Sequence, residues 1–124
     1  MAPGVTRTDE TGFTLVELMI AVLVLGVLTV IAVPTFFSVQ ASAVDGVAQS
    51  DLRNAKAAVV LYLTEHNGSF PSKASLEADG FSASEGVTGW ILEGSADGYC
   101  IEAVSGNGRP FNVRDDHGVT AGEC

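Results

Sequence analysis

Residues 12–37 of this 124-residue chain read GFTLVELMIAVLVLGVLTVIAVPTFF. This stretch is almost entirely apolar, and the other segments are described relative to it. From Leu18 to Val44 there are 27 residues without a charged side chain. As a helix rising about 1.5 Å per residue, this run measures about 40 Å, which exceeds the roughly 30 Å hydrocarbon thickness of a bilayer. The sequence therefore predicts a membrane-spanning helix.

A carboxylate stands at the entrance of this helix. Glu17 is the only charged residue between Phe13 and Val44. A charge in hydrocarbon costs several kcal/mol unless it is paired, so an ionisable residue there is a functional-site hypothesis by default. The alternative interpretation is a carboxylate that reaches back to the lipid headgroups.

The order of residues 12–17 resembles the N-terminus of type IV prepilins and pseudopilins, with a glycine, a phenylalanine and a glutamate at the same spacing. The resemblance covers roughly residues 12–37. It implies that a membrane peptidase cuts the chain after Gly12 and that the new amine of Phe13 is then methylated. It also implies that Glu17 of an incoming subunit pairs with the Phe13 amine of its neighbour in a growing filament.

Gly26 and Pro34 follow at the spacing that the same family shows. Proline removes a backbone hydrogen bond, and glycine weakens a helix interior by about 1 kcal/mol relative to alanine. The resemblance implies that the helix between them unwinds on assembly. The alternative is that both residues are simply tolerated, as they often are in membrane helices.

The resemblance also implies partners and a location. The partners are other copies of the chain and other pilins, a prepilin peptidase and methyltransferase, a membrane platform protein, and the lipid bilayer before assembly. The chain would reside as a single-pass protein in the cytoplasmic (inner) membrane and then in an extracellular pilus, whose role in motility, adhesion or DNA uptake stays open. The alternative function is a pseudopilin of a type II secretion or competence machine.

Two other interpretations of the apolar run involve no filament. A secretory signal cut at the small residues 41–43 would release a soluble protein that begins at Val44. The apolar run is, however, about twice as long as a normal signal core of roughly 7 to 15 residues. A plain membrane anchor that carries a non-pilin domain is the other possibility. Neither interpretation explains the position of Glu17.

Composition excludes several function classes. The net charge is −9, and residues 45–124 hold twelve acidic and five basic side chains, so strong nucleic-acid binding is not expected. The sequence has no nucleophile elbow, phosphate loop or catalytic triad pattern, so we expect neither an enzyme nor a cofactor. His117 follows Asp115 and Asp116, but no closely spaced ligand pair supports a metal site.

The sequence predicts an α+β fold with four segments. The resemblance implies that residues 1–12 are a cleaved leader and that residues 13–44 are the transmembrane and assembly half of a long helix. Residues 45–67 form the amphipathic outer half of that helix, because apolar residues recur at three- and four-residue intervals while Asp45 and other charges fall mostly elsewhere. Residues 68–124 form a small globular head, after a helix stop signal at Asn67-Gly68 and Pro71.

Three strand-like runs, at residues 87–93, 98–105 and 109–115, predict an antiparallel β-meander packed on the outer half of the helix. A short helical turn is expected at residues 73–79. The only two cysteines are Cys100 and Cys124, and in an exported domain they are expected to form a disulfide.

Overall fold

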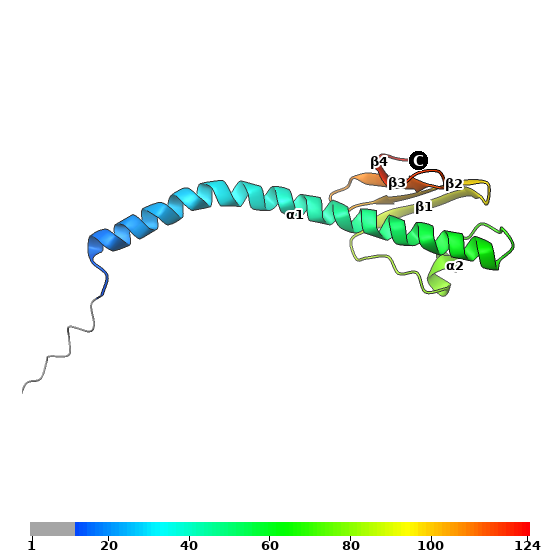
Figure 1. Cartoon of the computed structure of the whole chain (residues 1–124), viewed down its shortest axis with the longest axis horizontal. Coiled ribbons are helices and arrows are strands. Elements are labelled where there is room, and N and C mark those ends of the chain that lie inside the picture. The colour runs from blue at the N-terminus through cyan, green and yellow to red at the C-terminus, as the bar shows by residue number, and fades with distance from the viewer. Residues whose placement is uncertain (1–11) are drawn as a thin grey trace, which may run out of the picture. The chain divides into compact units, whose positions relative to one another are not determined.

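A computed structural model describes residues 12–124 as an α+β fold, which confirms the predicted fold class (Figure 1). The elements, in chain order, are α1 (Leu15–Glu65), α2 (Lys73–Ala78), β1 (Thr88–Ser95), β2 (Gly98–Val104), β3 (Pro110–Arg114) and β4 (Thr120–Ala121). The predicted leader, residues 1–12, lies outside the described residues except for Gly12. The chain divides into two compact units, the first ending at Ser38 and the second spanning Val39–Cys124.

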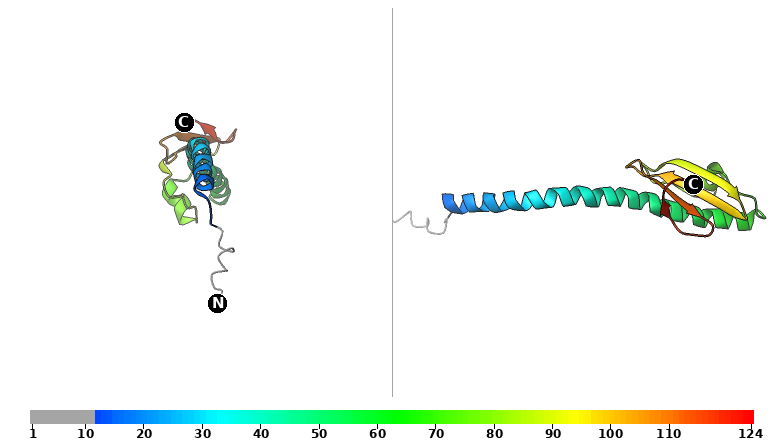
Figure 2. Two further views of the ribbon diagram at one scale, coloured as in Figure 1. Left: turned by 90° about the vertical axis from the view of Figure 1, so that its left-hand side faces the viewer. Right: turned by 90° about the horizontal axis from the view of Figure 1, so that it is seen from above.

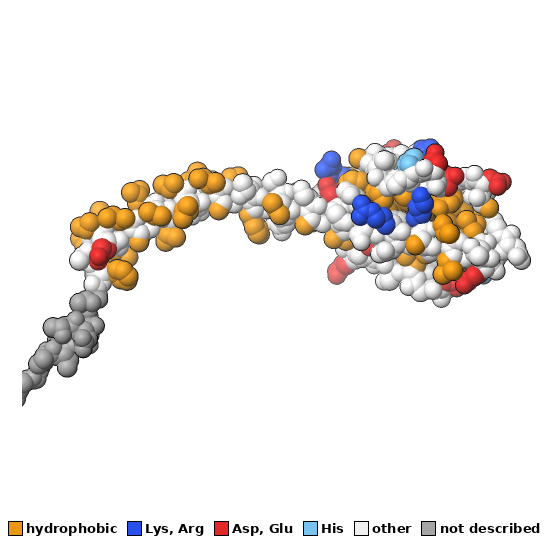
Figure 3. Space-filling model, viewed as in Figure 1, with side chains coloured by type: hydrophobic (Ala, Val, Ile, Leu, Met, Phe, Trp, Pro, Cys, Tyr) orange, Lys and Arg blue, Asp and Glu red, His pale blue; other side chains and the backbone are white. Residues whose placement is uncertain are grey.

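In the first unit, every described residue is exposed, and large apolar side chains dominate the helix surface (Figure 3). By length and composition, α1 can cross a membrane. Its polar side chains find partners within the helix: the Thr29 hydroxyl donates to the Leu25 carbonyl at 2.6 Å, and the Thr35 hydroxyl donates to the Ala32 carbonyl at 2.8 Å. A lipid-exposed segment must satisfy its polar groups internally, and these threonines do so.

The end of α1 follows the predicted stop signal. Asn67 adopts a left-handed conformation with a φ of 56°, and the backbone N–H of Gly68 donates to the Leu63 carbonyl at 2.8 Å. This bond between residues five apart is the long bond of a Schellman motif, which closes a helix by satisfying one of its last carbonyls. The helix ends at Glu65, two residues before the predicted end at residue 67.

The second unit is a four-stranded antiparallel sheet, in the order β1-β2-β3-β4, packed on the outer part of α1 (Figure 2). Small and aliphatic side chains of α1 meet alternate side chains of β2 and β3, and Leu76 of α2 is buried with them. The core residues contributed by α1, β2 and β3 are Ala48, Leu52, Ala55, Val59, Tyr99, Ile101, Ala103, Phe111 and Val113. This unit therefore encloses its own hydrophobic core.

The sheet differs from the prediction by one strand. The three predicted strands are present, with ends shifted by one or two residues, but β4 was not expected. It is only two residues long and pairs with Phe111 and Asn112 of β3, and the Asn112 amide adds a hydrogen bond to the Gly122 carbonyl at 2.9 Å. A strand this short and polar carries no alternating apolar pattern that a sequence analysis can detect.

Candidate functional site

The Gly12–Phe13 junction lies just outside the helix. Residues 12–14 carry no regular secondary structure, and α1 begins at Leu15. The Phe13 side chain is 87% exposed, and no atom lies within 4 Å of a Cβ built on Gly12. A peptide bond in an extended, exposed segment is accessible to a peptidase, whereas a bond within a helix would first require unwinding.

Thr14 and Glu17 form a reciprocal cap at the start of α1. The Glu17 carboxylate accepts a hydrogen bond from the Thr14 backbone N–H at 2.8 Å and one from the Thr14 hydroxyl at 3.2 Å. In return, the Thr14 hydroxyl oxygen accepts from the Glu17 backbone N–H at 3.2 Å. This arrangement is a capping box, whose sequence pattern is Ser or Thr followed three residues later by Glu or Gln.

The capping box changes the interpretation of Glu17. The sequence analysis expected this carboxylate to pair with a Phe13 amine or to reach the lipid headgroups. The structure instead gives it two hydrogen-bond donors from Thr14 within its own chain. The pattern from Thr14 to Glu17 was visible in the sequence, so a search for capping boxes would have found this role for Thr14.

Gly26 and Pro34 both lie inside α1, which remains helical throughout. Pro34 has no backbone N–H, so the carbonyl of Val30 loses its usual partner one turn earlier. Nothing lies within 4 Å of a Cβ built on Gly26, so no close contact within the chain requires a glycine there. Unwinding between these two residues remains a prediction.

In the second unit, the Asp45 side chain of α1 binds residues of the β2–β3 turn. Its carboxylate accepts hydrogen bonds from the Ser105 hydroxyl at 2.7 Å and the Asn107 amide at 3.0 Å, and it pairs with Arg109 at 2.8 Å. The Ser105 hydrogen bond, followed by the contacts with Asn107 and Arg109, lowers the pKa of Asp45 below its usual value, although burial acts in the opposite direction.

The burial of Asp45 corrects the sequence analysis. The helical periodicity placed Asp45 on the polar face of α1, but only 6% of this residue is exposed. Periodicity identifies which residues share a face of the helix, but it cannot show that a turn some 60 residues later supplies three donors. With those donors, a buried carboxylate is satisfied rather than costly.

Two further polar contacts fix loops of this unit to α1. The buried Asp51 carboxylate accepts from the backbone N–H of Ser84 at 2.6 Å and from its hydroxyl at 2.8 Å. The Lys56 ammonium donates to the Arg114 carbonyl at 2.6 Å and the His117 carbonyl at 3.1 Å. The long helix therefore holds the α2–β1 loop and the β3–β4 loop through these two side chains.

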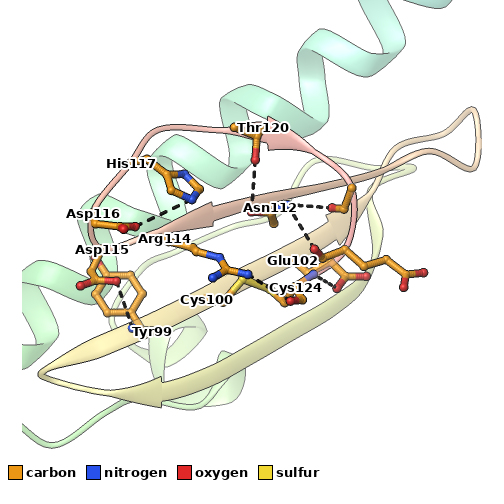
Figure 4. Close-up of a disulfide and its surroundings, with 12 residues drawn as sticks. Tyr99, Cys100, Glu102, Asn112, Arg114, Asp115, Asp116, His117, Thr120 and Cys124 are labelled. Carbon is orange, nitrogen blue, oxygen red and sulfur yellow. Dashed lines mark hydrogen bonds and ion pairs between the residues drawn. A yellow bond between two sulfur atoms is a disulfide. The ribbon is translucent and has the colours of Figure 1, made fainter.

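The predicted disulfide between Cys100 and Cys124 is present, with Cα atoms 6.0 Å apart (Figure 4). Hydrogen bonds support it on both sides: the Cys124 N–H donates to the Glu102 carboxylate at 3.0 Å, and Arg114 donates to the Cys124 carbonyl at 3.1 Å. Beside it, burial and then the Asp115 carboxylate raise the pKa of Tyr99 above its usual value. The disulfide attaches the C-terminal tail to β2.

The structure does not assemble a ligand set at the acidic turn. His117 Nε2 lies 3.8 Å from an Asp116 carboxylate oxygen, and Asp115 instead accepts from the Tyr99 N–H at 3.4 Å (Figure 4). Within residues 12–124, the only group of three residues that could hold a metal ion lies elsewhere, at Glu65, His66 and Asp79. The sequence analysis did not connect these residues, because Asp79 is separated from the other two by a loop and α2.

Comparison with known proteins identifies a matching family and several relatives of this chain. The model of the family described as "Prokaryotic N-terminal methylation motif" matches residues 7–33. The chain is 30% identical over 110 residues to the "Type IV wide pilus major component PilA4" of Thermus thermophilus, and the alignment covers 87% of this chain and 84% of that protein. The chain belongs to the type IV prepilin and pseudopilin family.

Other relatives of this pilin-family chain carry different names. It is 30% identical over 77 residues to a "ComG operon protein 3 homolog" of Bacillus licheniformis, covering 59% of this chain and 75% of that protein. It is 37% identical over 73 residues to the "Type II secretion system core protein G" of Pseudomonas aeruginosa, covering 58% of this chain and 51% of that protein. None of these names describes an enzyme.

Proposed function

We propose that this pilin-family chain is a structural subunit of a type IV pilus. A membrane peptidase cuts it between Gly12 and Phe13, the new Phe13 amine is methylated, and the mature chain polymerises through its apolar helix. The observation that carries the proposal is the exposed, non-helical Gly12–Phe13 junction inside a matched N-terminal methylation motif.

The exposed apolar segment supports polymerisation. From Phe13 to Val39, its large apolar side chains are exposed in the described part of the chain, so they would be covered first by lipid and then by other copies. Packing such helices head to tail is a heterologous contact that does not close on itself, and contacts of this kind generate filaments. The second unit carries its own core, so it does not need the filament in order to fold.

Glu17 would set the register between subunits. Before assembly, its carboxylate is held by Thr14 within the same chain. After cleavage, the Phe13 amine is cationic with or without a methyl group, and in a medium of low dielectric its attraction to the carboxylate is stronger than that of the uncharged Thr14 donors. Exchange of the Thr14 donors for the amine of a neighbouring subunit would therefore favour one axial position.

The second candidate function is a pseudopilin of a secretion or DNA-uptake machine. It is favoured by the 37% identity to the secretion protein and by the relative from the ComG operon. Those alignments cover 58% and 59% of this chain, whereas the alignment to the pilus component covers 87% and includes the head. We therefore place the pilus subunit first.

The proposal specifies partners and a location. Before assembly, the chain lies in the cytoplasmic membrane with lipid around α1, where the peptidase and methyltransferase and then the platform protein of the assembly machine act on it. After assembly, it contacts other copies and other pilins in an extracellular filament.

The test is a pair of substitutions at Glu17, expressed in cells that assemble the filament. Glu17→Gln keeps the capping box but removes the charge, and Glu17→Ala removes both. We expect both variants to be cleaved at Gly12, and sheared filaments to decrease at least about tenfold in both, which corresponds to about 1.4 kcal/mol per subunit contact. Glu93→Ala, which changes an exposed carboxylate of β1, is the control and should assemble normally. Normal filaments from Glu17→Gln would contradict the charge-pairing mechanism.

A further inference from the structure

The ends of α1 and α2 lie close together in the head, and three metal-ligating side chains meet there. Glu65 is the last residue of α1, His66 follows it, and Asp79 is the C-cap of α2. One candidate ligand atom from each residue lies within 4.8 Å of the other two. All three side chains are exposed, and Figure 1 shows α2 beside the end of α1.

This corner of the head carries uncompensated negative charge. The C-terminal end of a helix has a partial negative charge, and here two such ends meet beside two carboxylates. Neither helix has a basic residue in its last turn. Within residues 12–124, neither Glu65 nor Asp79 takes part in an ion pair with a lysine or arginine. A bound cation would relieve the repulsion between these groups.

The ring of His66 is held in place by contacts with Tyr62, one turn earlier in the chain. It stacks on the Tyr62 ring, with centroids 3.8 Å apart and planes 9° apart, and its Nδ1 lies 3.1 Å from the Tyr62 carbonyl oxygen. A carbonyl oxygen only accepts hydrogen bonds, so Nδ1 carries the proton and Nε2 keeps its lone pair in the neutral ring. Histidines that bind metals commonly donate their other ring N–H to a carbonyl or carboxylate in this way.

There is also space beside the cluster for the remaining ligands of an ion. A surface cavity of about 190 Å³ lies between the two helices, and its lining includes Tyr62, Glu65, Asp79 and Phe81. Three protein ligands leave one or more coordination positions for water in a zinc-type site. The cavity can hold that water.

We propose that Glu65, His66 and Asp79 bind one divalent transition-metal ion of the Zn²⁺ type. An imidazole with two carboxylates suits zinc and its neighbours, whereas Ca²⁺ and Mg²⁺ prefer sites made only of oxygen. Bonds from the ion to its ligands would be about 2.0–2.2 Å long, so the three exposed side chains need only small rotations to close on it. The ion would tie α2 to the end of α1 and stabilise this corner of the head.

The test is a ZnCl₂ titration of the full chain, purified in detergent without a polyhistidine tag, followed by calorimetry. We expect saturable binding of one Zn²⁺ per chain. Glu65→Gln, Asp79→Asn and His66→Ala should each weaken binding at least about tenfold. The two carboxamide variants alter exposed side chains that form no hydrogen bond or ion pair within residues 12–124, so they are expected to fold normally, as circular dichroism can verify.

His117→Ala is the matched control. His117 is also exposed, its Nδ1 also lies near a carbonyl oxygen, at 2.8 Å from Gly118 O, and a carboxylate lies beside it. It has no third ligand in the described part of the chain, so its loss should leave Zn²⁺ affinity within about twofold. The proposal is overturned by the absence of saturable binding, by unchanged affinity in Glu65→Gln and Asp79→Asn, by lost affinity in His117→Ala, or by a preference for Ca²⁺ over Zn²⁺.

Discussion

One helix serves two regions of this molecule in opposite ways. In the first unit, α1 exposes every side chain, including large ones such as Leu28, which is 56% exposed. In the second unit, the same helix buries Leu52 completely beneath the sheet. The difference shows that the first region depends on lipid or other subunits for its stability, whereas the second region is stabilised by contacts within the chain.

The largest expected effect is on the stability of the head, and it is tested by truncating one buried and one exposed leucine of α1. Leu52→Ala leaves a cavity in the core and should lower the free energy of unfolding of the head by about 2–5 kcal/mol. Leu28→Ala removes the same atoms from an exposed position and should leave that free energy unchanged within about 0.5 kcal/mol. The fluorescence of Trp90, the only tryptophan, reports urea unfolding of the head in detergent. Equal losses in the two variants would remove the distinction between the regions.

A second prediction concerns the disulfide, whose loss should affect the second unit but not the first. The two cysteines are 24 residues apart in sequence, and replacing both by serine should destabilise the head by about 3 kcal/mol in the chain-entropy model. Cleavage at Gly12 should be unaffected, because the junction lies in the other unit. Urea unfolding measures the first effect, and the mass of the membrane-bound chain measures the second. A cysteine-free variant with unchanged head stability would show that the tail is held by hydrogen bonds alone.

The smallest effect is expected at Asp45, as a change in how steeply the stability of the head declines in acid. Because the folded state lowers the pKa of this carboxyl from its usual 3.8, its contribution to stability is complete above about pH 4 and is lost as pH falls through the folded pKa. Asp45→Asn removes that contribution and should therefore flatten the decline of head stability between about pH 4 and pH 2.

Asp97→Asn, at an exposed position in the β1–β2 turn, is the control for this pH series. It should retain the acid sensitivity of the unaltered chain in urea unfolding measured at each pH. An Asp45→Asn variant that declines as steeply as the control would contradict the assignment of this carboxylate.

The features that the sequence predicted were local ones. The apolar run predicted α1, Asn67-Gly68 predicted its end, and alternating residues predicted β1 to β3. Each depends on residues close together in the chain, where periodicity and turn chemistry determine the outcome. Cleavage at the Gly12–Phe13 junction, inferred from a short motif, stays a prediction.

The features that it missed depend on contacts between distant residues. The buried environment of Asp45 is created by residues 105–109, and β4 is recognisable only by its pairing with β3. The group that includes Glu65 and Asp79 exists only because α2 folds back beside α1. The capping box of Thr14 and Glu17 is the exception, because its pattern is local and was available from the sequence.

The most direct test of the pilus assignment is the N-terminal residue and intact mass of the protein purified from cells. The account predicts a chain that begins at Phe13, with the added mass of one methyl group on its amine and with the disulfide closed. A chain that begins at Val44, or one that retains Met1 and the residues up to Gly12, would contradict it. Either of those results would leave an exported or membrane-anchored domain that is not processed as a pilin.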